Sequence, residues 1–443
     1  MARRKKPLPS GPQFAEIMDL THQGQGVARI DGKTVFIDRA LPGEEVEFVY
    51  TRQHRQYDEG SLSRVIKSSE DRVEPKCQHF EICGGCNLQH LKPQAQIAIK
   101  QKILIDNLQR LGHVAPQHIR EPLTGQLWGY RRKARLGVKH VFKKGKVLVG
   151  FREAASRYLA DLTRCEILVP EVGEHLEELS ALILSLSSPH TIPQIEVAVG
   201  DQGKALVIRH LEPLTAEDRD KLVQFAKDMQ LDIYLQAKGP DTITPLWPQH
   251  PVLRYSLSAY DLSFDFLPAD FVQVNAEINQ KMIALVLNLL QLEPQMHVLE
   301  LFCGLGNFTL PIAQKVSSVT AVEGDKGLIE RARQNAQRNH IDNVSYHTAD
   351  LMADISGLPW WKNQSYDRVF LDPPRSGAEI AVHQIGKLNV PRIVYVSCNP
   401  ATLARDAGIL VNEYGYDLIE VGVMDMFPHT AHVESIAIFS REK

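Results

Sequence analysis

From about Phe264 to the C-terminus, short apolar runs alternate with stretches that have helical spacing. The apolar runs read HVLEL, VTAVE, RVFLD and RIVYVS. Runs of this kind are typical of strands buried on both faces, so the alternation predicts a parallel sheet covered by helices. The last two apolar segments, DLIEVGVMDMF and HVESIAIFS, follow each other without a helix between them. Residues 264–443 are therefore expected to form an α/β domain whose sheet ends in an antiparallel edge.

The N-terminal and middle parts of the chain have different patterns. Between Gly24 and Ile66, bursts such as KTVFID and EEVEFVY alternate apolar with polar residues and are separated by the turn signals DG and LPGE. This period-two pattern predicts a small antiparallel barrel or sandwich over residues 10–68. Residues 69–263 mix strand-like segments with a helical segment around 93–112 that could pack on the C-terminal domain, and they are expected to form an α+β central domain.

The composition is that of a multidomain globular protein. The 443 residues exceed one ordinary core. The sequence has no run of about eighteen apolar residues, and its basic N-terminus meets proline and serine where a secretory apolar segment would begin. We therefore expect a cytoplasmic protein without membrane contact, whose six cysteines do not form a disulfide framework.

The net charge of -3 does not by itself indicate a polyanionic partner, but the charge is unevenly distributed. Between Arg131 and Lys146, the run RRKARLGVKHVFKKGK holds eight Lys or Arg residues and no acid. Such a run is usually a solvated face, and it is also the local pattern of a surface that binds nucleic acid.

Three of the cysteines, Cys77, Cys83 and Cys86, lie close together in KCQHFEICGGCNLQH. A structural zinc site prefers paired C-x2-C arms or a Cys2His2 set, which here would use His79 or His90, and the first gap of five residues fits it poorly. A radical S-adenosylmethionine enzyme also has three close cysteines, but with another spacing. Chance clustering of buried thiols is the plainest alternative, although the two glycines between the last two cysteines allow tight folding around a bound group.

An iron-sulfur cluster held by four thiolates would need one more cysteine. Cys303 and Cys398 lie in C-terminal motifs that have other uses, which leaves Cys165 in DLTRCEIL. The central domain is therefore expected to hold an iron-sulfur cluster on four ligands: Cys77, Cys83, Cys86 and Cys165.

The first strand of the C-terminal domain leads into the glycine-containing turn of LELFCGLGNFTL. Gly304 and Gly306 let the backbone approach a ligand at the start of the next helix. The third glycine of a dinucleotide fingerprint is missing, which disfavours a nicotinamide site. Glu323 ends the second strand, where a carboxylate can accept hydrogen bonds from ribose hydroxyls. Asp350 ends the third strand, where an adenine amino group could bind.

The fourth and fifth strands end in FLDPPRSG and YVSCNPATLARD, which place Asp372 and Cys398 at the ligand-binding edge of the sheet. A thiolate there could add to carbon 6 of uracil, which makes carbon 5 nucleophilic enough to attack an electrophilic methyl group. A base must then remove the proton from carbon 5. Glu434, just before the last strand, is the candidate, because partial burial would raise its pKa. Each residue alone could instead be structural, as a buried cysteine or a strand-end acid.

Taken together, FVQVN, ELFCGLGNFTL, VEGD, DPPRSG, SCNP and HVESIA resemble the TrmA/RumA family of bacterial S-adenosylmethionine-dependent RNA uracil-C5 methyltransferases. The resemblance covers nearly the whole chain and implies a C-terminal Rossmann-like methyltransferase domain. The segment GQGVARIDGKTVFIDRALPGEEVEF resembles a TRAM domain, an OB-like RNA-binding barrel. By this likeness Cys398 is the nucleophile and Glu434 the base, and the methyl donor is bound by Gln273, Phe302, Asn307, Glu323, Asp350 and Asp372.

The resemblance also bears on the partner and on the cysteines. Family members with both a TRAM-like barrel and a cysteine cluster act on 23S ribosomal RNA, and they use the four cysteines named above as [4Fe-4S] ligands. The target base must be extruded from its stack, at a cost that phosphate contacts from Arg131, Arg132, Lys133 and Arg135 could offset. We expect a monomer. Two alternatives stay open: transfer RNA as the substrate, and a non-catalytic RNA-binding iron-sulfur protein.

Overall fold

The structure is a computed structural model that describes residues 8–9, 11–362 and 365–441. The chain divides into two compact units. Unit 1 consists of Met1–Ile103 together with Phe427–His432, and unit 2 consists of Leu104–Met426 together with Val433–Lys443. Among the described residues, every helix is too short or too polar to cross a lipid bilayer.

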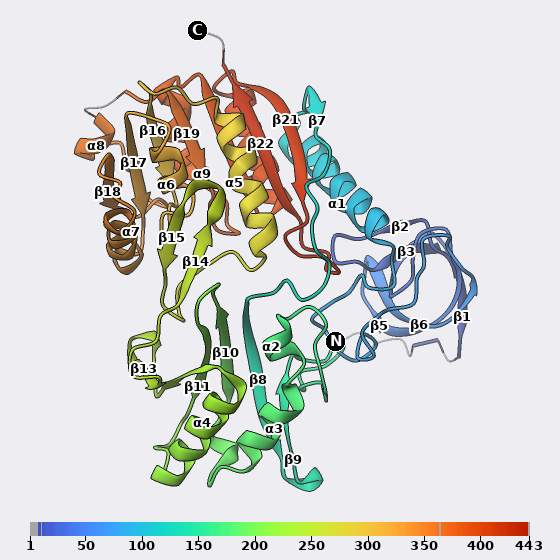
Figure 1. The fold of residues 1–443 in the computed structure, drawn as a ribbon. Coiled ribbons are helices and arrows are strands. Elements are labelled where there is room, and N and C mark those ends of the chain that lie inside the picture. The colour runs from blue at the N-terminus through green and yellow to red at the C-terminus, as the bar shows by residue number, and fades with distance from the viewer. Residues whose placement is uncertain (1–7, 10, 363–364, 442–443) are drawn as a thin grey trace, which may run out of the picture. The chain divides into compact units, whose positions relative to one another are not determined.

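Unit 1 contains a six-stranded sheet that curls into a barrel, drawn in blue in Figure 1. Its strands follow the order β1-β5-β6-β4-β3-β2, and every neighbouring pair is antiparallel except β4 and β6, which run parallel. The predicted small β-barrel is therefore confirmed, with one parallel pairing that the pattern did not reveal. The strands are β1 (Gln13–Glu16), β2 (Asp19–Leu20), β3 (Gly26–Ile30), β4 (Lys33–Asp38), β5 (Glu45–Gln53) and β6 (Tyr57–Lys67).

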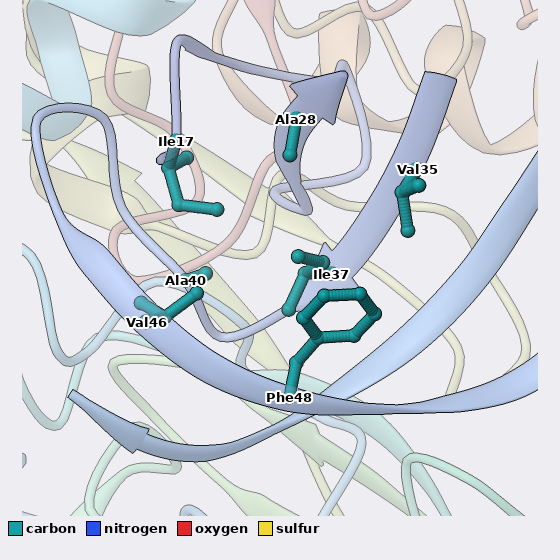
Figure 2. Close-up of a cluster of buried hydrophobic side chains, with 7 residues drawn as sticks. All are labelled: Ile17, Ala28, Val35, Ile37, Ala40, Val46 and Phe48. Carbon is teal, nitrogen blue, oxygen red and sulfur yellow. The ribbon is translucent and has the colours of Figure 1, made fainter. Parts of the chain in front are cut away.

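Small and branched apolar side chains fill the barrel (Figure 2). Val35 and Ile37 alternate with more exposed residues along β4, which turns both inward toward Phe48 on β5. Gly60 on β6 makes room for this ring, because a Cβ there would lie 2.5 Å from a Phe48 ring carbon. The cluster consists of Ile17, Ala28, Val35, Ile37, Ala40, Val46 and Phe48.

A buried ion pair joins the barrel to the segment that follows it. Glu44 is fully buried, and its carboxylate accepts hydrogen bonds of 2.6 Å and 2.8 Å from the Arg72 guanidinium and 2.8 Å from the Leu41 backbone amide. Burial opposes ionisation of Glu44, but the hydrogen bonds from Arg72 and Leu41 outweigh it, so the pKa of this carboxyl is lowered.

Unit 1 also contains a short stretch from far along the chain, Phe427–His432. Gln96, in helix α1 (Pro93–Asn107), accepts a 2.9 Å hydrogen bond from the His429 backbone amide through Oε1. Asn87 Oδ1 accepts a 2.8 Å hydrogen bond from the Ala431 backbone amide, and the Asn87 backbone amide donates a 3.1 Å bond to the His429 carbonyl. These bonds replace the missing sheet or helix partners of this stretch.

Unit 2 begins with a six-stranded sheet in the order β13-β12-β11-β10-β8-β9, in which only β11 and β12 run parallel. Helix α3 (Leu176–Leu184) packs against β9, and helix α4 (Ala216–Met229) packs against β12 and β13. The strands are β8 (Lys133–Val141), β9 (Lys146–Gly150), β10 (Gln194–Val199), β11 (Lys204–Arg209), β12 (Asp232–Gln236) and β13 (Ile243–Trp247). A hairpin of β14 (Arg254–Leu257) and β15 (Leu262–Asp265) follows.

The rest of unit 2 is an eight-stranded sheet in the order β18-β17-β16-β19-β20-β22-β21-β7 (Figure 1). The five strands from β18 to β20 are parallel, and β22 pairs antiparallel with both β20 and β21, which confirms the predicted α/β domain and its antiparallel edge. The strands are β7 (His118–Ile119), β16 (His297–Leu301), β17 (Ser318–Glu323), β18 (Val344–Thr348), β19 (Arg368–Leu371), β20 (Arg392–Ser397), β21 (Asp417–Met424) and β22 (Glu434–Ser440).

Helices connect the parallel strands of this sheet, and the apolar side of each helix packs against the sheet. The apolar run of β16 is buried at Val298, Leu299 and Leu301, as expected for a central strand. The helices are α5 (Ala276–Leu290), α6 (Thr309–Ala313), α7 (Lys326–Arg338), α8 (Pro359–Lys362), α9 (Glu379–Leu388) and α10 (Pro400–Asn412).

The prediction of a central domain built around an iron-sulfur cluster is wrong. Such a cluster requires converging thiolates, but in the described part of the chain no group of three or more His, Cys, Asp or Glu side chains is placed to hold a metal. The Cys83 sulfur instead accepts a 3.3 Å hydrogen bond from the Gly85 amide, and burial raises the pKa of this thiol.

Candidate active site

The turn after β16 has an unusual backbone conformation that leaves its backbone accessible to a ligand. Phe302, Gly304 and Gly306 all have positive φ angles, of 64°, 53° and 91°. Glycine adopts such angles freely, whereas Phe302 is strained by about 1 kcal/mol or more, a cost that is usually found at functional sites. A Cβ at Gly304 would meet no atom within 4 Å, so this turn borders open space.

Two predicted site residues are fixed on either side of this turn. Glu323, at the end of β17, accepts a 3.2 Å hydrogen bond from the Gly304 amide and a 2.7 Å bond from the Gly324 amide. Asn307 exchanges two side-chain hydrogen bonds with Asn279 of α5, at 2.8 Å and 3.0 Å, and accepts a third at 3.1 Å from the Tyr255 hydroxyl. The orientation of the Asn307 amide is therefore determined by its neighbours before any ligand binds.

Gln273 lies in the loop between β15 and α5, and this loop is anchored at its base. Buried Asp270 accepts a 2.5 Å hydrogen bond from Arg331 and a 2.7 Å bond from the Leu267 amide. Lys133 donates to the Pro268 carbonyl from the other side. The Gln273 amide then donates a 3.4 Å hydrogen bond to the Asp372 carboxylate. Gln273 and Asn279 also line a shallow pocket, which connects Gln273 to the Asn307 side of the site.

Asp372, Cys398 and Glu434 lie at the ends of three neighbouring strands. Asp372 and Cys398 directly follow β19 and β20, and Glu434 is the first residue of β22. The register pairs Ser397 with Ser435 across β20 and β22, and the Ser435 hydroxyl donates to the Ser397 carbonyl at 3.1 Å. The next residue of each antiparallel strand therefore places Cys398 opposite Glu434.

Burial raises the pKa values of all three groups, and neighbouring carboxylates add to this effect at Cys398 and Glu434. Burial, followed by the nearby Glu434 and Asp372 carboxylates, raises the pKa of Cys398 to about 11. Burial raises the pKa of Asp372 to about 7. Burial and the charge of Asp372 raise the pKa of Glu434 well above its usual value. The positive charge of Arg375 acts in the opposite direction on both Cys398 and Glu434.

Two residues of this region were not predicted as site residues from the sequence. Arg375 follows the Asp-Pro-Pro motif, and a basic residue three positions after Asp372 was the signal that could have found it. Glu300 is 1% exposed inside the apolar strand β16, and its Oε2 makes no hydrogen bond to the described residues. Burial, together with the Asp372 and Glu323 carboxylates, raises the pKa of Glu300 to about 8. A charged residue in an otherwise apolar strand was the available signal.

Asp350 differs from the other predicted residues. It is exposed, two positions beyond the end of β18, and its carboxylate accepts a 2.9 Å hydrogen bond from the Met352 amide. Within the described part of the chain it forms no hydrogen bond or ion pair with another predicted site residue.

The predicted basic run divides into two parts in the structure. Arg131 donates to the Lys133 carbonyl at 3.0 Å, Arg132 pairs with Asp201 at 2.5 Å, and Lys133 donates to the Pro268 carbonyl. These three residues bind protein groups near the Gln273 loop. Arg135 and Lys139, farther along β8, are exposed.

Comparison with known families identifies both ends of the chain. A family model described as tRNA (Uracil-5-)-methyltransferase matches residues 206–442, and one described as TRAM domain matches residues 13–62. These matches agree with the resemblance seen in the sequence motifs.

Curated relatives match over the full length. The protein of Xanthomonas campestris pv. campestris (strain 8004) named 23S rRNA (uracil(1939)-C(5))-methyltransferase RlmD is 50% identical over 444 residues, which cover 100% of both chains. A protein of the same name from Alkalilimnicola ehrlichii is 51% identical and covers 100% of this chain and 99% of its own.

A solved structure shares the fold. The crystal structure of Pyrococcus abyssi tRNA (uracil-54, C5)-methyltransferase in complex with S-adenosyl-L-homocysteine has a TM-score of 0.72 and 23% sequence identity, and the match covers 96% of this chain and 100% of that one. With a matching family model over more than half of the chain and full-length relatives at half identity, the chain belongs to the family of RNA uracil-C5 methyltransferases.

Proposed function

We propose that the protein transfers a methyl group from S-adenosylmethionine to carbon 5 of a uridine in 23S ribosomal RNA. The observation that carries this proposal is the placement of Cys398 opposite Glu434, beside Asp372, at the edge of the sheet. A nucleophile and a base on adjacent strands are what methylation of uracil at carbon 5 needs. The names of the full-length relatives support the choice of RNA.

The residues around the glycine turn suit the donor, which carries a positive sulfonium, a positive amino group and a ribose. The negative charges of Glu323 and Asp372 act on the Glu300 carboxyl, so a cation near these three groups would be favoured. The buried Glu300 oxygen without a hydrogen-bond partner and the open space at Gly304 are consistent with a ligand in this position.

We assign binding of the methyl donor to six residues, and the contacts and backbone geometry of most of them indicate their roles. Glu323 would hold the ribose hydroxyls, because one of its oxygens is already oriented by the Gly304 amide. Phe302 and Asn307 shape the turn, and Gln273 and Asp372 close the opposite side through their shared hydrogen bond. When bound, the donor supplies an electrophilic methyl group. The proposed set is Gln273, Phe302, Asn307, Glu323, Asp350 and Asp372.

Cys398 acts as the nucleophile in this proposal. Its thiolate forms a bond to carbon 6 of uracil, and the electrons of the 5,6 double bond move to carbon 5 and the carbonyl at carbon 4. Carbon 5 then accepts the methyl group, while the bond between that methyl group and the donor sulfur breaks and leaves its electrons on the sulfur. Because the pKa of Cys398 is about 11, its proton must pass to solvent water before attack, and Arg375 is the cation that favours the thiolate.

Glu434 acts as the base that completes the reaction. After methylation, carbon 5 still carries its proton, and the ionised Glu434 carboxylate removes it. The electrons of the carbon–hydrogen bond restore the double bond, and the bond between carbon 6 and the Cys398 sulfur breaks. Burial raises the pKa of Glu434, which makes its carboxylate a stronger base than an exposed glutamate.

The test is transfer of a radiolabelled methyl group to a protein-free 23S transcript, with the position mapped after digestion. Wild-type protein should label one uridine, Cys398→Ala should give neither product nor adduct, and Glu434→Gln should lower turnover about a hundredfold or more while an RNA adduct accumulates. Labelling of the transcript by Cys398→Ala at the wild-type rate would refute the assignment of the nucleophile.

Transfer RNA is the second candidate substrate. It is favoured by the fold shared over 96% of the chain with an enzyme named for uracil 54 of transfer RNA. Unfractionated transfer RNA in the same assay decides between the two: a higher kcat/KM on transfer RNA than on the 23S transcript would replace the ribosomal assignment.

We further propose three functional regions: an RNA-binding barrel at 10–68, a central domain at 69–263 and the methyltransferase domain at 264–443. The barrel matches the TRAM description, which supports its role in RNA binding. A monomer in the cytoplasm, where ribosomal RNA is made, is the state in which we expect the protein to act.

A further inference from the structure

A basic groove lies on the central sheet of unit 2, away from the residues assigned to methyl transfer. It measures about 1100 Å³, including its solvent-open part. Four cationic side chains line it, and no carboxylate is among its described lining residues. They are Arg135 and Lys139 of β8 and Arg152 and Arg157 of the following hairpin, residues 151–160.

The sequence builds this groove with two glycines. Gly137 of β8 and Gly150 of β9 are paired in register, so one face of the sheet lacks side chains there. A Cβ at Gly137 would lie 2.7 Å from Leu159, and a Cβ at Gly150 would lie 2.5 Å from Leu162. The two glycines therefore allow the hairpin and the residues after it to pack closely against the sheet. Side chains alternate along a strand, so Arg135 and Lys139 project from the same face as Gly137.

The carboxylates near the groove are already bound. Glu196 pairs with Arg135 at 3.0 Å, Glu153 of the hairpin accepts a 2.6 Å hydrogen bond from Ser156, and Asp161 pairs with Lys146 at 2.5 Å. Lys139, Arg152 and Arg157 are exposed and form no ion pair with a described residue. The groove therefore has an excess of positive charge that a polyanion can neutralise.

An exposed aromatic ring lies beside these cations. Tyr158 is 64% exposed, and the Arg157 guanidinium lies 5.9 Å from the centre of its ring. An aromatic face next to a positively charged track is the combination that binds unpaired nucleotides, because bases stack on the ring while phosphates meet the cations. Double-stranded RNA would not offer its base faces to such a ring.

The groove is also connected to the candidate active site by a rigid strand. The Arg132 amide donates a 2.9 Å hydrogen bond to the Val274 carbonyl, next to Gln273. Gly137 lies five residues farther along the same extended segment, roughly 16 Å away at the rise of a β-strand. A single strand a few nucleotides long can span this distance.

We propose that this groove binds a single-stranded segment of the substrate RNA a few nucleotides from the methylated uridine, with one base stacked on Tyr158 and phosphates bound by Lys139, Arg152 and Arg157. The inference rests on the proposed function, because it assumes an RNA substrate. In this proposal the groove holds the RNA strand that flanks the target uridine. Contacts outside the catalytic edge then offset the free-energy cost of extruding the target base.

The test uses full-length protein and the 23S transcript with the methylated uridine mapped first. Arg152→Gln/Arg157→Gln should raise KM and the dissociation constant for this RNA about tenfold, leave kcat and donor affinity unchanged, and reduce the slope of log affinity against log salt by about 1.4, at about 0.7 for each lost phosphate contact. Tyr158→Ala should weaken binding about tenfold, and Tyr158→Phe should keep wild-type affinity, because its ring remains.

Two controls make the result decisive. Arg219→Gln/Lys315→Gln removes the same amount of charge from exposed positions elsewhere in unit 2, and it should bind RNA like the wild type. Fragments of the transcript cut back to the base-paired neighbourhood of the target should bind the wild type and the groove variants equally. Wild-type activity combined with unchanged KM in the groove variants would overturn the inference alone. A wild-type protein that methylates no RNA would overturn the proposed function first.

Discussion

The side-chain amide of Asn399 donates a 2.9 Å hydrogen bond to the backbone carbonyl of Arg375. This bond joins the loop after β19, which contains Asp372, to the start of helix α10, which follows Cys398. Buried Asp406 of α10 adds two further bonds, from the Ala378 amide at 2.8 Å and the Tyr395 hydroxyl at 2.7 Å. The loop that contains Asp372 is thus tied to the start and the body of α10 by the side chains of Asn399 and Asp406.

Asn399→Asp separates the two structural roles of this residue, which are the cap of α10 and the hydrogen bond to the Arg375 carbonyl. Asn399 Oδ1 also caps α10 by accepting a 3.1 Å bond from the Ala401 amide, and aspartate keeps that cap. Aspartate loses the donor to Arg375 and faces its carbonyl with a negative charge. We expect stability within about 1 kcal/mol of the wild type, and kcat lower by about tenfold or more because the loop shifts.

Asn399→Ala is the matched variant, since it removes both the cap and the donor. It should lower the free energy of unfolding by about 1 kcal/mol and lower kcat as much as Asn399→Asp does. Urea titrations and steady-state methyl transfer measure the two effects, and full activity of Asn399→Asp would contradict the role given to the loop bond.

The thiol of Cys398 should react slowly with alkylating reagents at neutral pH. With a pKa of about 11, about 10⁻⁴ of the thiol is ionised at pH 7. The alkylation rate should therefore rise roughly tenfold per pH unit from pH 7 to pH 10. Mass spectrometry of the Cys398 peptide after timed exposure to iodoacetamide gives the rate.

Two neighbours should move this profile in opposite directions. Glu434→Gln removes a carboxylate that raises the pKa of Cys398, so the profile should shift to lower pH, and Arg375→Gln removes a cation that lowers this pKa, so the profile should shift to higher pH. Equal profiles in all three proteins would show that these charges do not reach the thiol.

Glu300 should make the ligand-free protein less stable as pH rises. Its pKa is about 8 in the folded protein, against a usual value of 4.5, so the folded state holds a proton that the unfolded state has lost. Between these two values stability should fall with increasing pH by up to about 1.4 kcal/mol per unit from this group. Glu300→Gln cannot lose that proton, so its thermal unfolding curve at pH 8 should lie above that of the wild type.

The comparison at low pH is the internal control for Glu300→Gln. Below pH 4.5 both states of the wild type are protonated at this position, and the two proteins should unfold at similar temperatures. A constant difference from pH 4 to pH 9 would mean that the substitution acts through packing alone.

The buried pair of Glu44 and Arg72 should be important for stability. Arg72→Leu leaves a buried carboxylate without its guanidinium and should cost about 3 kcal/mol in urea unfolding. Glu44→Leu/Arg72→Leu removes both charges and should recover most of that loss. A double variant that is no more stable than Arg72→Leu would contradict the argument that the unpaired charge is the cause.

Much of the C-terminal fold could be predicted because it depends on local patterns. The apolar runs predicted the parallel strands, and the missing helix before the last strand predicted the antiparallel pairing of β21 with β22. Strand ends in such a sheet meet at one edge, so Asp372 and Cys398 could be placed together from their motifs. Glu434 joins them because β22 runs in the opposite direction.

Other features depend on contacts between distant residues. Eight cationic residues in sixteen positions predicted one basic surface. In the structure, however, Arg132 pairs with Asp201 and Lys133 donates to the Pro268 carbonyl, and no local sequence pattern reveals these contacts. The cysteine spacing suggested a metal cluster, but spacing cannot show whether side chains converge. Arg375 and Glu300 were missed because their significance comes from the charges that face them across strands.

The six residues of Phe427–His432 limit how this protein can be divided. They belong to unit 1 and are fixed there by Asn87 and Gln96, yet Glu434 follows only two positions after His432. A chain shortened to the methyltransferase region would keep every proposed catalytic residue but lose the partners of this stretch. Grafting the methyltransferase region onto another RNA-binding module would therefore require that these six residues be given new partners.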